Sequence, residues 1–399
     1  MLIMSKFMGS TSGPLILIIL IFAISIRKEL VGGEMISSAI NKAIIKTIKV
    51  DEDEIIDCYD IYKQPSLNHP SLHNHSIQMR PSMNPKNIKL DNFEIFQLTQ
   101  TWHKYGTCPR GTIPIRRNRK DYRSKLPRKH RLSKISHSKT PNTSQPNDIT
   151  DDHEYAVITV HGGSFLGGQA KINLWNPTVE TPVEISVSQI WVLAGVSEDF
   201  NSIEAGWEVC QPRYGDYQTR FFILWTTDGY NNSCTNLECE GFVHTSSDVA
   251  LGCNFTEIST FRGDQKDATF SIRKDQASGN WWVQIQDTPV GYYPSSLFTK
   301  LSKTAVKVEF GGEIFNDKSK GRHTTAQMGS GHFPSEGGFG ISSYFHQVQV
   351  IDENNEAQNP ENVEVHVSNP TCYDLKIDDK HSKGYGFYYG GPGYNDNCQ

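Results

Sequence analysis

The chain has 399 residues, of which 21% are charged and 11% are aromatic, a composition typical of a folded globular protein with room for about two domains. The net charge of −5 conceals an asymmetry, because residues 1–149 carry 23 Lys and Arg against 12 Asp and Glu, whereas residues 150–399 carry 16 against 32. The acidic second part argues against nucleic-acid binding there and suits a protein that works at low pH, where carboxylates are neutralised.

The N-terminus has the pattern of a secretory signal peptide over residues 1–28. Lys6 supplies the positive start, and an apolar run from Pro14 to Ile26 is closed by Arg27 and Lys28. The run is short for a membrane span, and an uncleaved signal anchor is the alternative. We therefore predict a secreted protein with no stable membrane span after signal cleavage. Four N-glycosylation sequons agree with that compartment and begin at Asn74, Asn142, Asn231 and Asn254.

Eight cysteines, an even number, suit disulfide bonds in an oxidising compartment. Cys234 and Cys239 are spaced for a small disulfide loop. A metal site is the alternative there, but no second close pair exists to complete it. The sequence alone leaves the connectivity open. The expected pairs are Cys58 with Cys108, Cys234 with Cys239, Cys372 with Cys398, and Cys210 with Cys253.

The segment after the signal divides into a helix and a small module. Residues 34–57 are predicted as a short helix, because isoleucines recur there at helical spacing with Lys between them. Residues 58–108 are rich in proline and predict strands and loops with little helix. Three histidines between residues 69 and 75 are spaced for a metal site on a helix. Pro70 argues against that helix, so we interpret them as solvated.

Residues 109–151 are predicted as a disordered linker. Twelve Lys and Arg fall between Arg110 and Lys139 with only Asp121 against them, and Ser, Thr, Asn and Pro then dominate. Such a stretch cannot bury a core. We interpret it as a processing site between a pro-segment and a mature domain, and a solvated tether is the alternative.

From residue 152 onward, short apolar strands follow at regular spacing, punctuated by Gly, Pro, Asn and Asp. No amphipathic helix is evident, which indicates an all-β sandwich or barrel. The predicted strands are 155–160, 171–175, 184–194, 203–210, 220–226, 241–244, 268–273, 281–286, 305–315 and 344–350.

Two of these strands carry a carboxylate in an apolar setting. Glu204 stands between Ile203 and Ala205, and Glu313 follows two glycines. Glycine in a strand often marks a bulge or a place where a ligand comes close. Two such glutamates on one sheet could face each other across a groove, so that one acts as a base and the other as an acid on a water molecule. The alternative is that both face solvent, as Glu208 and Glu309 could.

Other hydrolytic chemistries fit less well. His161-Gly162-Gly163-Ser164 is superficially like an oxyanion-hole loop, and Ser330 stands between two glycines. Neither has the G-x-S-x-G pattern or its strand–helix context. All cysteines can be paired, which disfavours cysteine catalysis, and the H-E-x-x-H motif of zinc peptidases is absent from the sequence.

At the two glutamates the sequence resembles the neprosin family of plant secreted proteins. Residues 60–65 and 77–81 also resemble that family's N-terminal activation peptide. The motifs that carry the resemblance span most of residues 150–399 and are found at 188–192, 201–207, 219–222, 225–230, 279–282, 311–313 and 327–334.

The resemblance implies a glutamic endopeptidase made as a zymogen, which cleaves after proline at acid pH without a metal or organic cofactor. It implies a concave antiparallel β-sandwich preceded by a small mixed pro-domain, with catalytic residues at Glu204 and Glu313. We therefore expect a monomer in the apoplast or cell wall whose own pro-segment inhibits it. The expected domains are 1–28 (signal peptide), 29–108 (activation peptide), 109–151 (basic linker with the processing site) and 152–399 (peptidase).

Further roles can be suggested for residues near the glutamates. Gln189 and Gln327 are candidates for stabilising an oxyanion, because an amide N–H donates without titrating. Aromatic side chains that could line the cleft are Trp191, Trp207, Trp225 and Tyr230, with core packing as the alternative for each. Two other functions stay open: a non-catalytic cell-wall module that binds polysaccharide through surface Trp and Tyr, and a glycosidase that uses the same two carboxylates.

Overall fold

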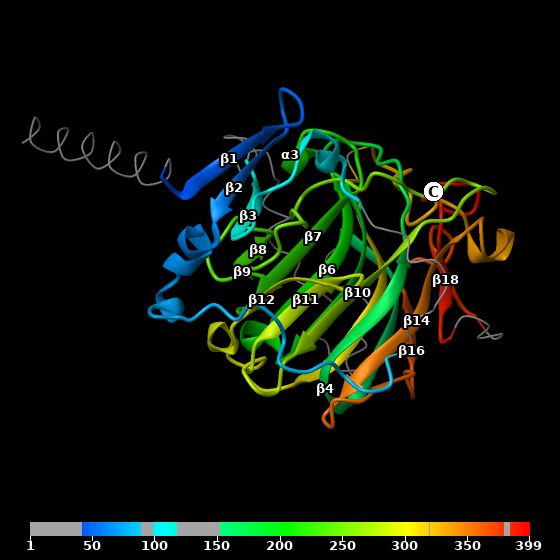
Figure 1. Cartoon of the computed structure of the whole chain (residues 1–399). Helices are drawn as coiled ribbons and strands as arrows, with labels where there is room; N and C mark the ends of the chain where they lie inside the picture. Colours follow the sequence, from blue (N-terminus) through cyan, green and yellow to red (C-terminus); the bar gives the residue numbers. More distant parts are fainter. Residues whose placement is uncertain (1–41, 89–98, 118–151, 319, 379–383) are drawn as a thin grey trace, which may run out of the picture.

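The computed structural model describes residues 42–88, 99–117, 152–318, 320–378 and 384–399 (Figure 1). The expected signal peptide, most of the expected linker and the sequon at Asn142 lie outside the described residues. Within the part of the chain that is described, no helix is long and apolar enough to cross a membrane.

The N-terminal module is built on a three-stranded antiparallel sheet, β1 (Ile44–Lys49), β2 (Ile55–Asp60) and β3 (Thr112–Arg116). Of the helix predicted over 34–57, residues 42 and 43 are helical, but the prediction is wrong from residue 44 onward, because β-branched isoleucines also favour strands and here pair along β2. The disordered linker is wrong over residues 112–116, which pair with the other edge of β2. Four short 3-10 helices complete the module: η1 (Ile61–Lys63), η2 (Pro65–Asn68), η3 (Pro70–Leu72) and η4 (Thr101–Tyr105).

The rest of the chain forms two packed sheets that share one long strand, β4 (His153–Asn173). The first half of β4 pairs with β13 and β16, and its second half pairs with β10 and β14. The strand passes from one sheet to the other at the exposed His161-Gly162-Gly163, the stretch that superficially matched an oxyanion-hole loop. That stretch is therefore a crossing between sheets.

The first sheet has the order β8-β7-β6-β5-β13-β4, with β16 on the far edge of β4. It contains the two glutamate-bearing strands, β6 and β13, on either side of β5. Its strands other than β4 are β5 (Ile185–Ala194), β6 (Asn201–Cys210), β7 (Arg220–Thr226), β8 (Ser233–Thr235), β13 (Ala305–Phe315) and β16 (Glu364–Val367).

The second sheet has the order β9-β12-β11-β10-β4-β14, and β15, β18 and β17 continue it beyond β14. Its strands are β9 (Val243–His244), β10 (Asp267–Lys274), β11 (Trp281–Ile285), β12 (Thr288–Tyr293), β14 (Ser343–Asp352), β15 (Ala357–Gln358), β17 (Asp374–Ile377) and β18 (Phe387–Gly390). Short helical turns connect the strands: η7 (Ser197–Asp199), α3 (Gln211–Tyr214), η8 (Ser295–Leu297) and η9 (Pro334–Glu336).

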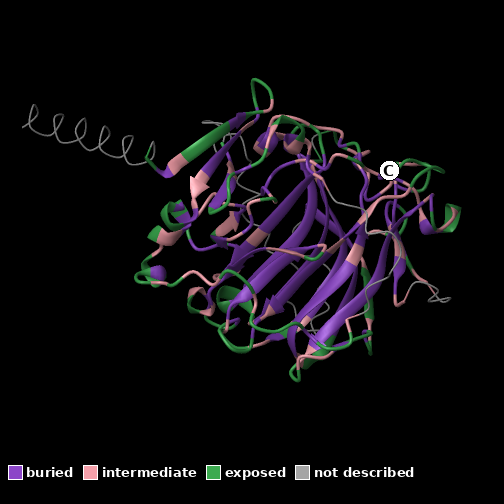
Figure 2. Ribbon diagram, in the orientation of Figure 1, coloured by how far each residue is buried: buried purple, intermediate pink, exposed green. Residues whose placement is uncertain are grey.

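The core lies between the two sheets, where alternate residues of each strand meet. Ile190 and Trp207 from the first sheet join Phe270 and Trp281 from the second in one buried cluster. Figure 2 shows the central strands of the two sheets almost continuously buried, whereas β1 and β16 are largely exposed and other exposed residues lie mainly in the connections. The predicted all-β sandwich is therefore confirmed, and each of the ten predicted strands overlaps an observed strand.

Three of the four expected disulfides are present, Cys58–Cys108, Cys234–Cys239 and Cys372–Cys398. The fourth, between Cys210 and Cys253, is wrong: both cysteines are free and buried. Cys210 ends β6 and packs into the main core, whereas Cys253 belongs to a separate cluster against the N-terminal module. The first residues of β7 lie between them, because Arg220 pairs with Glu208 on one side and Asn254 on the other.

Candidate active site

Strand alternation places the predicted glutamates on the same face of the first sheet. Apolar neighbours such as Ile203 and Ala205 point into the core, so Glu204 points to the opposite face. Glu313 also points there, because the next residue, Ile314, packs in the core. We call this surface of β4, β5, β6, β7 and β13 the glutamate face.

Glu204 and Glu313 occupy different rows of the glutamate face. Glu204 lies opposite Trp191 of the intervening strand β5, and Glu313 lies opposite Val187 of the same strand. Between these rows runs a third, in which Gln189 is flanked by Gly206 on β6 and Gly311 on β13. The two glutamates are thus diagonal to one another across Gln189.

The glycines of the middle row are required by close packing of the backbone. A Cβ at Gly206 would lie 2.0 Å from the carbonyl oxygen of Ser188, and one at Gly311 would lie 2.2 Å from that of Ala156. Because neither position can carry a side chain, Gln189 is flanked on both neighbouring strands by bare backbone. Glycine at such strand positions often permits another chain to come close.

Glu204 accepts hydrogen bonds from two hydroxyl groups, those of Ser202 and Tyr230, the latter at 2.6 Å. Burial and the neighbouring Glu204 carboxylate raise the pKa of Tyr230 well above its ordinary value. The phenol therefore stays protonated and acts as a donor. Phe200 packs on the Tyr230 ring, with the centroids 5.6 Å apart, and holds it over the glutamate face.

Glu313 is held by three donors from three different residues. The Nδ1 atom of His153 lies 2.6 Å from its Oε1, and the hydroxyl of Tyr155 lies 3.3 Å from the same oxygen. Nε2 of Gln189 donates to Oε2 at 3.2 Å. His153 and Tyr155 belong to β4 and Gln189 to β5, so pairing of β13 with both neighbours assembles this site.

Two further glutamates lie on the same face, although from the sequence they were named only as residues that could face solvent. Glu208 and Glu309 share the alternation of Glu204 and Glu313, and all four are between 2% and 6% exposed. Burial raises the pKa of Glu208, against the opposing effects of Arg213 and the hydroxyl of Tyr214. Glu309 accepts from the hydroxyl of Thr159 at 3.0 Å. The spacing of four residues within each pair was the signal that could have identified them.

The other predicted site residues divide between the two faces. Trp191 lies on the glutamate face between Glu204 and Glu309, and Tyr230 covers that face. Trp207 and Trp225 are on the opposite side, in the core, so their predicted place in the cleft is wrong. Trp207 is three positions from Glu204 on the same strand, so it faces the other way. Trp225 pairs with the core residue Ile203.

Gln327 does not join the glutamates. Its side-chain oxygen accepts from the backbone N–H of Thr178 at 3.0 Å, and its carbonyl accepts from Ser186. Ser186 has the core-facing alternation of β5, opposite to that of Gln189. Of the two amides proposed for an oxyanion, only Gln189 is therefore in contact with a predicted catalytic glutamate.

One group of described side chains has metal-ligand spacing, His323 with Cys372 and Cys398. Both sulfurs belong to the Cys372–Cys398 disulfide, so they have no thiolate to offer a metal ion. His323 is itself engaged by Glu154 at 2.8 Å. These residues do not make a metal centre.

Comparison with known proteins gives matches over most of the described chain. The family model for neprosin matches residues 182–392, and the model for the neprosin activation peptide matches residues 47–159. Scytalido-glutamic peptidase, solved with a peptide-based transition-state analogue, has 11% identity and a TM-score of 0.34, covering 60% of this chain and 98% of that one. SCP-B of the eqolisin family of peptidases, solved with the tripeptide Ala-Ile-His, has 9% identity and a TM-score of 0.31, covering 59% and 96%.

Proposed function

This chain belongs to the neprosin family and carries that family's activation peptide, and on this basis we propose that it is a secreted glutamic endopeptidase made as a zymogen. The carrying observation is that Glu204 and Glu313 are both buried on one face of the sheet, each held by donors, and that in the row between them Gln189 has a glycine on either side. The proposed substrate is a peptide with proline before the cleaved bond, and the proposed working pH is acidic.

In the proposed reaction a peptide lies over Gly206 and Gly311, with its scissile carbonyl near Gln189. One glutamate takes a proton from a water molecule as the water oxygen attacks the carbonyl carbon. The other gives a proton to the leaving nitrogen, so that the C–N bond breaks and the two glutamates together return to their starting protonation. The amide N–H of Gln189, which now donates to Glu313, is available to the developing oxyanion.

The surrounding donors have positioning roles. Tyr230 and Ser202 fix the carboxyl of Glu204, and His153 and Tyr155 fix that of Glu313. Such supports matter because a catalytic group must be held close to its productive geometry before substrate arrives. The proposal therefore assigns substrate chemistry to the glutamates and Gln189, and orientation to their neighbours.

The testing experiment incubates acidified protein with a proline-containing peptide and, in parallel, with cell-wall glycans. Peptide cleavage supports the proposal, whereas glycan cleavage or glycan binding alone would favour a glycosidase or a polysaccharide-binding module. Glu204→Gln and Glu313→Gln keep shape but remove the titrating group. Each is expected to lower kcat/KM by at least roughly a thousandfold, because a pair that acts as a unit fails when either member is lost.

The double variant should be no worse than either single variant, since the losses are not additive. Glu364→Gln is the matched control, an exposed glutamate on β16 of the same sheet, and it should keep full activity. Folding of every variant is checked by thermal unfolding. Near-normal cleavage by Glu204→Gln would contradict the assignment.

A further inference from the structure

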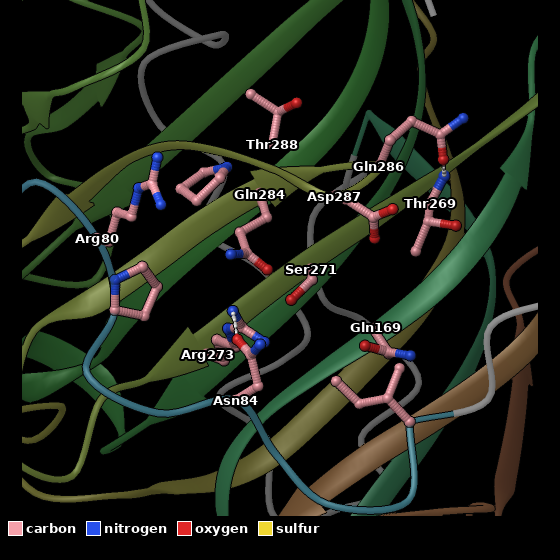
Figure 3. A pocket seen from close by; sticks show the side chains of 13 residues that line it. Arg80, Asn84, Gln169, Thr269, Ser271, Arg273, Gln284, Gln286, Asp287 and Thr288 are labelled. Carbon is pink, nitrogen blue, oxygen red and sulfur yellow. Dashed lines mark hydrogen bonds between the residues drawn. The ribbon is translucent and has the colours of Figure 1, made fainter. Parts of the chain in front are cut away.

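A polar cavity lies on the outer face of the second sheet, away from the glutamate face. Its volume is about 580 Å³, and Figure 3 shows side chains from neighbouring strands converging on it. The strands β4, β10 and β11 form its floor, and a segment of the activation peptide crosses over it. The polar side chains that line it include Asn84, Gln169, Ser271, Arg273 and Gln284.

The crossing segment, residues 77–88, is called the strap. One end is fixed to the second sheet by Gln78 and Ser82, which both donate to Asp275, at 2.7 and 2.9 Å. At the other end Lys86 exchanges backbone hydrogen bonds with the β14–β15 turn, both of 2.9 Å. An extended peptide is thus already bound across this face.

Between these ends the strap leaves some polar groups of the cavity floor without a hydrogen-bond partner among the described residues. Nη2 of Arg273 donates to the side-chain oxygen of Asn84 at 2.8 Å, but within the described part of the chain Nε of Arg273 has no hydrogen-bond partner. The hydroxyl of Ser271 also has none. Arg273 is 6% exposed and Ser271 is 3% exposed. Buried polar groups without partners are costly, so their presence together indicates a site built for a better ligand than the strap.

The missing partner can be identified from the chemistry of Arg273. Among the described residues no carboxylate forms an ion pair with it. Burial lowers its pKa to about 10 against the opposing effect of the nearby Asp275 carboxylate, which still leaves it a cation at acid and neutral pH. A carboxylate would accept from Nε and Nη2 together, the side-on geometry in which a guanidinium binds most strongly. The neutral Asn84 amide occupies only one of these two donors.

We propose that the groove on the second sheet is a binding site for an extended peptide bearing an Asp or Glu side chain, which Arg273 and Ser271 receive in place of Asn84. The strap covers this site in the full-length chain and exposes it when the activation peptide leaves. A peptide is favoured because the observed occupant is one, fixed by its backbone and amide side chains. None of the described residues that line the cavity has an aromatic side chain to stack on a sugar ring.

The exposure of the groove rests on the maturation step of the proposed function, but peptide binding does not. The test therefore uses full-length chain carrying Glu204→Gln, with a site for an added specific protease placed within residues 118–151. After folding, the chain is cut and the activation segment is removed by gel filtration. Failure of the peptidase proposal would leave this measurement unaffected.

Three fluorescent peptides of residues 77–88 are compared by anisotropy: the native sequence, Asn84→Asp, and Asn87→Asp. The last adds the same charge three residues from the Arg273 contact and is the matched control. The Asn84→Asp peptide should bind at least about tenfold more tightly than the other two, because it alone forms the charge-assisted pair. Arg273→Gln in the protein should remove this advantage.

A second measurement keeps the proposal testable if Arg273→Gln fails to fold. In the uncut Glu204→Gln chain, Asn84→Asp should slow hydrogen exchange of the strap, and Asn87→Asp should not. Equal affinity of the three peptides, no binding, or an activation segment that cannot be removed would overturn the proposal. Binding of oligogalacturonate without binding of any peptide would also overturn it, in favour of an acidic-glycan site.

Discussion

Glu204 and Trp207 are three residues apart on one strand, and this odd spacing puts them on opposite faces of the sheet. The prediction that both line a cleft therefore conflicts with the alternation from which the strand was predicted. Counting positions would have kept Glu208 with Glu204 and moved Trp207 to the core. Tyr230 is different, because it follows β7 in a turn with a φ of 65°. Alternation along a strand could not have placed its hydroxyl on Glu204.

Tyr230→Phe tests that hydroxyl as a positioning group. The variant keeps the ring that packs on Phe200 but removes the donor to Glu204. We expect kcat to fall by roughly 10- to 100-fold, the scale of a lost hydrogen bond to a charged group of about 1.5–3 kcal/mol, with little change in KM. Steady-state kinetics and thermal unfolding check this result.

Tyr217→Phe, at an exposed tyrosine, is the control and should behave as the unmodified protein does. A Tyr230→Phe variant with unchanged kcat would show that Ser202 alone suffices to hold Glu204. A change in KM alone would instead place Tyr230 against substrate.

The contact between Gln189 and Glu313 illustrates what the sequence could not provide. The two residues are 124 positions apart, and their meeting depends on the register of β5 against β13. Strand alternation identifies the face on which each side chain lies, but it does not identify which residues are opposite one another. Gln189 and Gln327 were consequently equal candidates on sequence, and only long-range pairing separates them.

At the scale of elements, strands bounded by turn residues were predictable, and β7 and β13 agree at both ends. Short strands such as β8 and β15 were missed because two or three residues hold too little pattern for period two to be recognised. The error over 44–49 has another cause. Isoleucine fits either a helix or a strand, and the strand wins because β2 lies beside it.

The free cysteines give a prediction about the junction between the N-terminal module and the sandwich. Cys253 packs with Cys58, Cys108 and Trp102 of the module, whereas Cys210 lies within the main core. Burial raises the pKa of both thiols, that of Cys210 to about 12. Neither should react with a thiol reagent in the full-length chain.

Removal of the activation segment should make one thiol reactive, because it uncovers Cys253 and leaves Cys210 buried. Titration with a chromogenic thiol reagent before and after cutting counts the groups, and Cys253→Ser should abolish the new signal. Two thiols under denaturing, non-reducing conditions are expected throughout. Finding none there would establish a Cys210–Cys253 bridge and contradict the structure.

Glu154 and His323 tie the start of β4 to the segment after β13. Nδ1 of His323 lies 2.8 Å from the carbonyl oxygen of Thr324 and must donate to it, so Nε2, 2.8 Å from Glu154, donates only in the charged imidazolium. Burial opposes charge on both groups, but their mutual hydrogen bond prevails. It lowers the pKa of Glu154 below 4.5 and raises that of His323 above 6.5.

These directions predict where on the pH scale the pair stabilises the fold. The Glu154 contribution is present above pH 4.5 and is lost as pH falls through its lowered folded pKa. The His323 contribution is present below pH 6.5 and is lost as pH rises through its raised folded pKa. Both stabilising contributions are complete only between pH 4.5 and pH 6.5. His323→Gln in a Glu204→Gln chain should lower the free energy of unfolding by roughly 1–3 kcal/mol in that window.

Denaturant unfolding across a pH series measures the effect, and the loss should shrink toward alkaline pH, where the unmodified chain also loses the charged pair. A constant difference between the two chains at every pH would mean that His323 contributes through packing alone. Glu364→Gln serves again as an exposed control, with an expected change near zero.

At the scale of the whole molecule, the described part of the activation segment is attached mainly away from Glu204 and Glu313, although Glu54 reaches Arg220, which lies opposite Glu208 on the glutamate face. Gln64 bonds the backbone of His244 on β9, Gln100 bonds that of Ala250, and the strap crosses the second sheet. Figure 1 shows this N-terminal module beside one end of the sandwich. The family resemblance implied an attached, inhibitory pro-segment, but the apolar and amide contacts that hold it have no compositional signature.

In the buried ion pair of this attachment, the charges have the opposite signs to the net charges of the two parts of the chain. The module contributes the anion, Glu54, and the sandwich contributes the cation, Arg220, with Nη1 and Oε2 2.7 Å apart. Arg116 of the module lies 3.6 Å from the same carboxylate oxygen. Neutralising Glu54 would leave two buried guanidinium groups with less compensation. Removal of the Glu54 charge is therefore expected to weaken the attachment, and acid is expected to weaken it through the loss of net negative charge on the sandwich.

Glu54→Gln removes this charge at any pH. We expect the full-length protein to be inert at neutral pH and to shorten on acidification to a form that begins between about residue 125 and residue 155, where an exposed linker would be cut. Glu54→Gln should be cut faster and at higher pH, because removal of one partner from a buried pair costs about 3–5 kcal/mol. N-terminal sequencing and gel electrophoresis across a pH series follow the reaction.

Lys86→Gln breaks only the exposed pair with Glu356 and should be cut as the unmodified chain is. Glu204→Gln should stay full-length unless active enzyme is added, and a rate that rises with protein concentration would identify cleavage between molecules. Processing of Glu54→Gln at the unmodified rate and pH would show that this ion pair does not hold the zymogen closed.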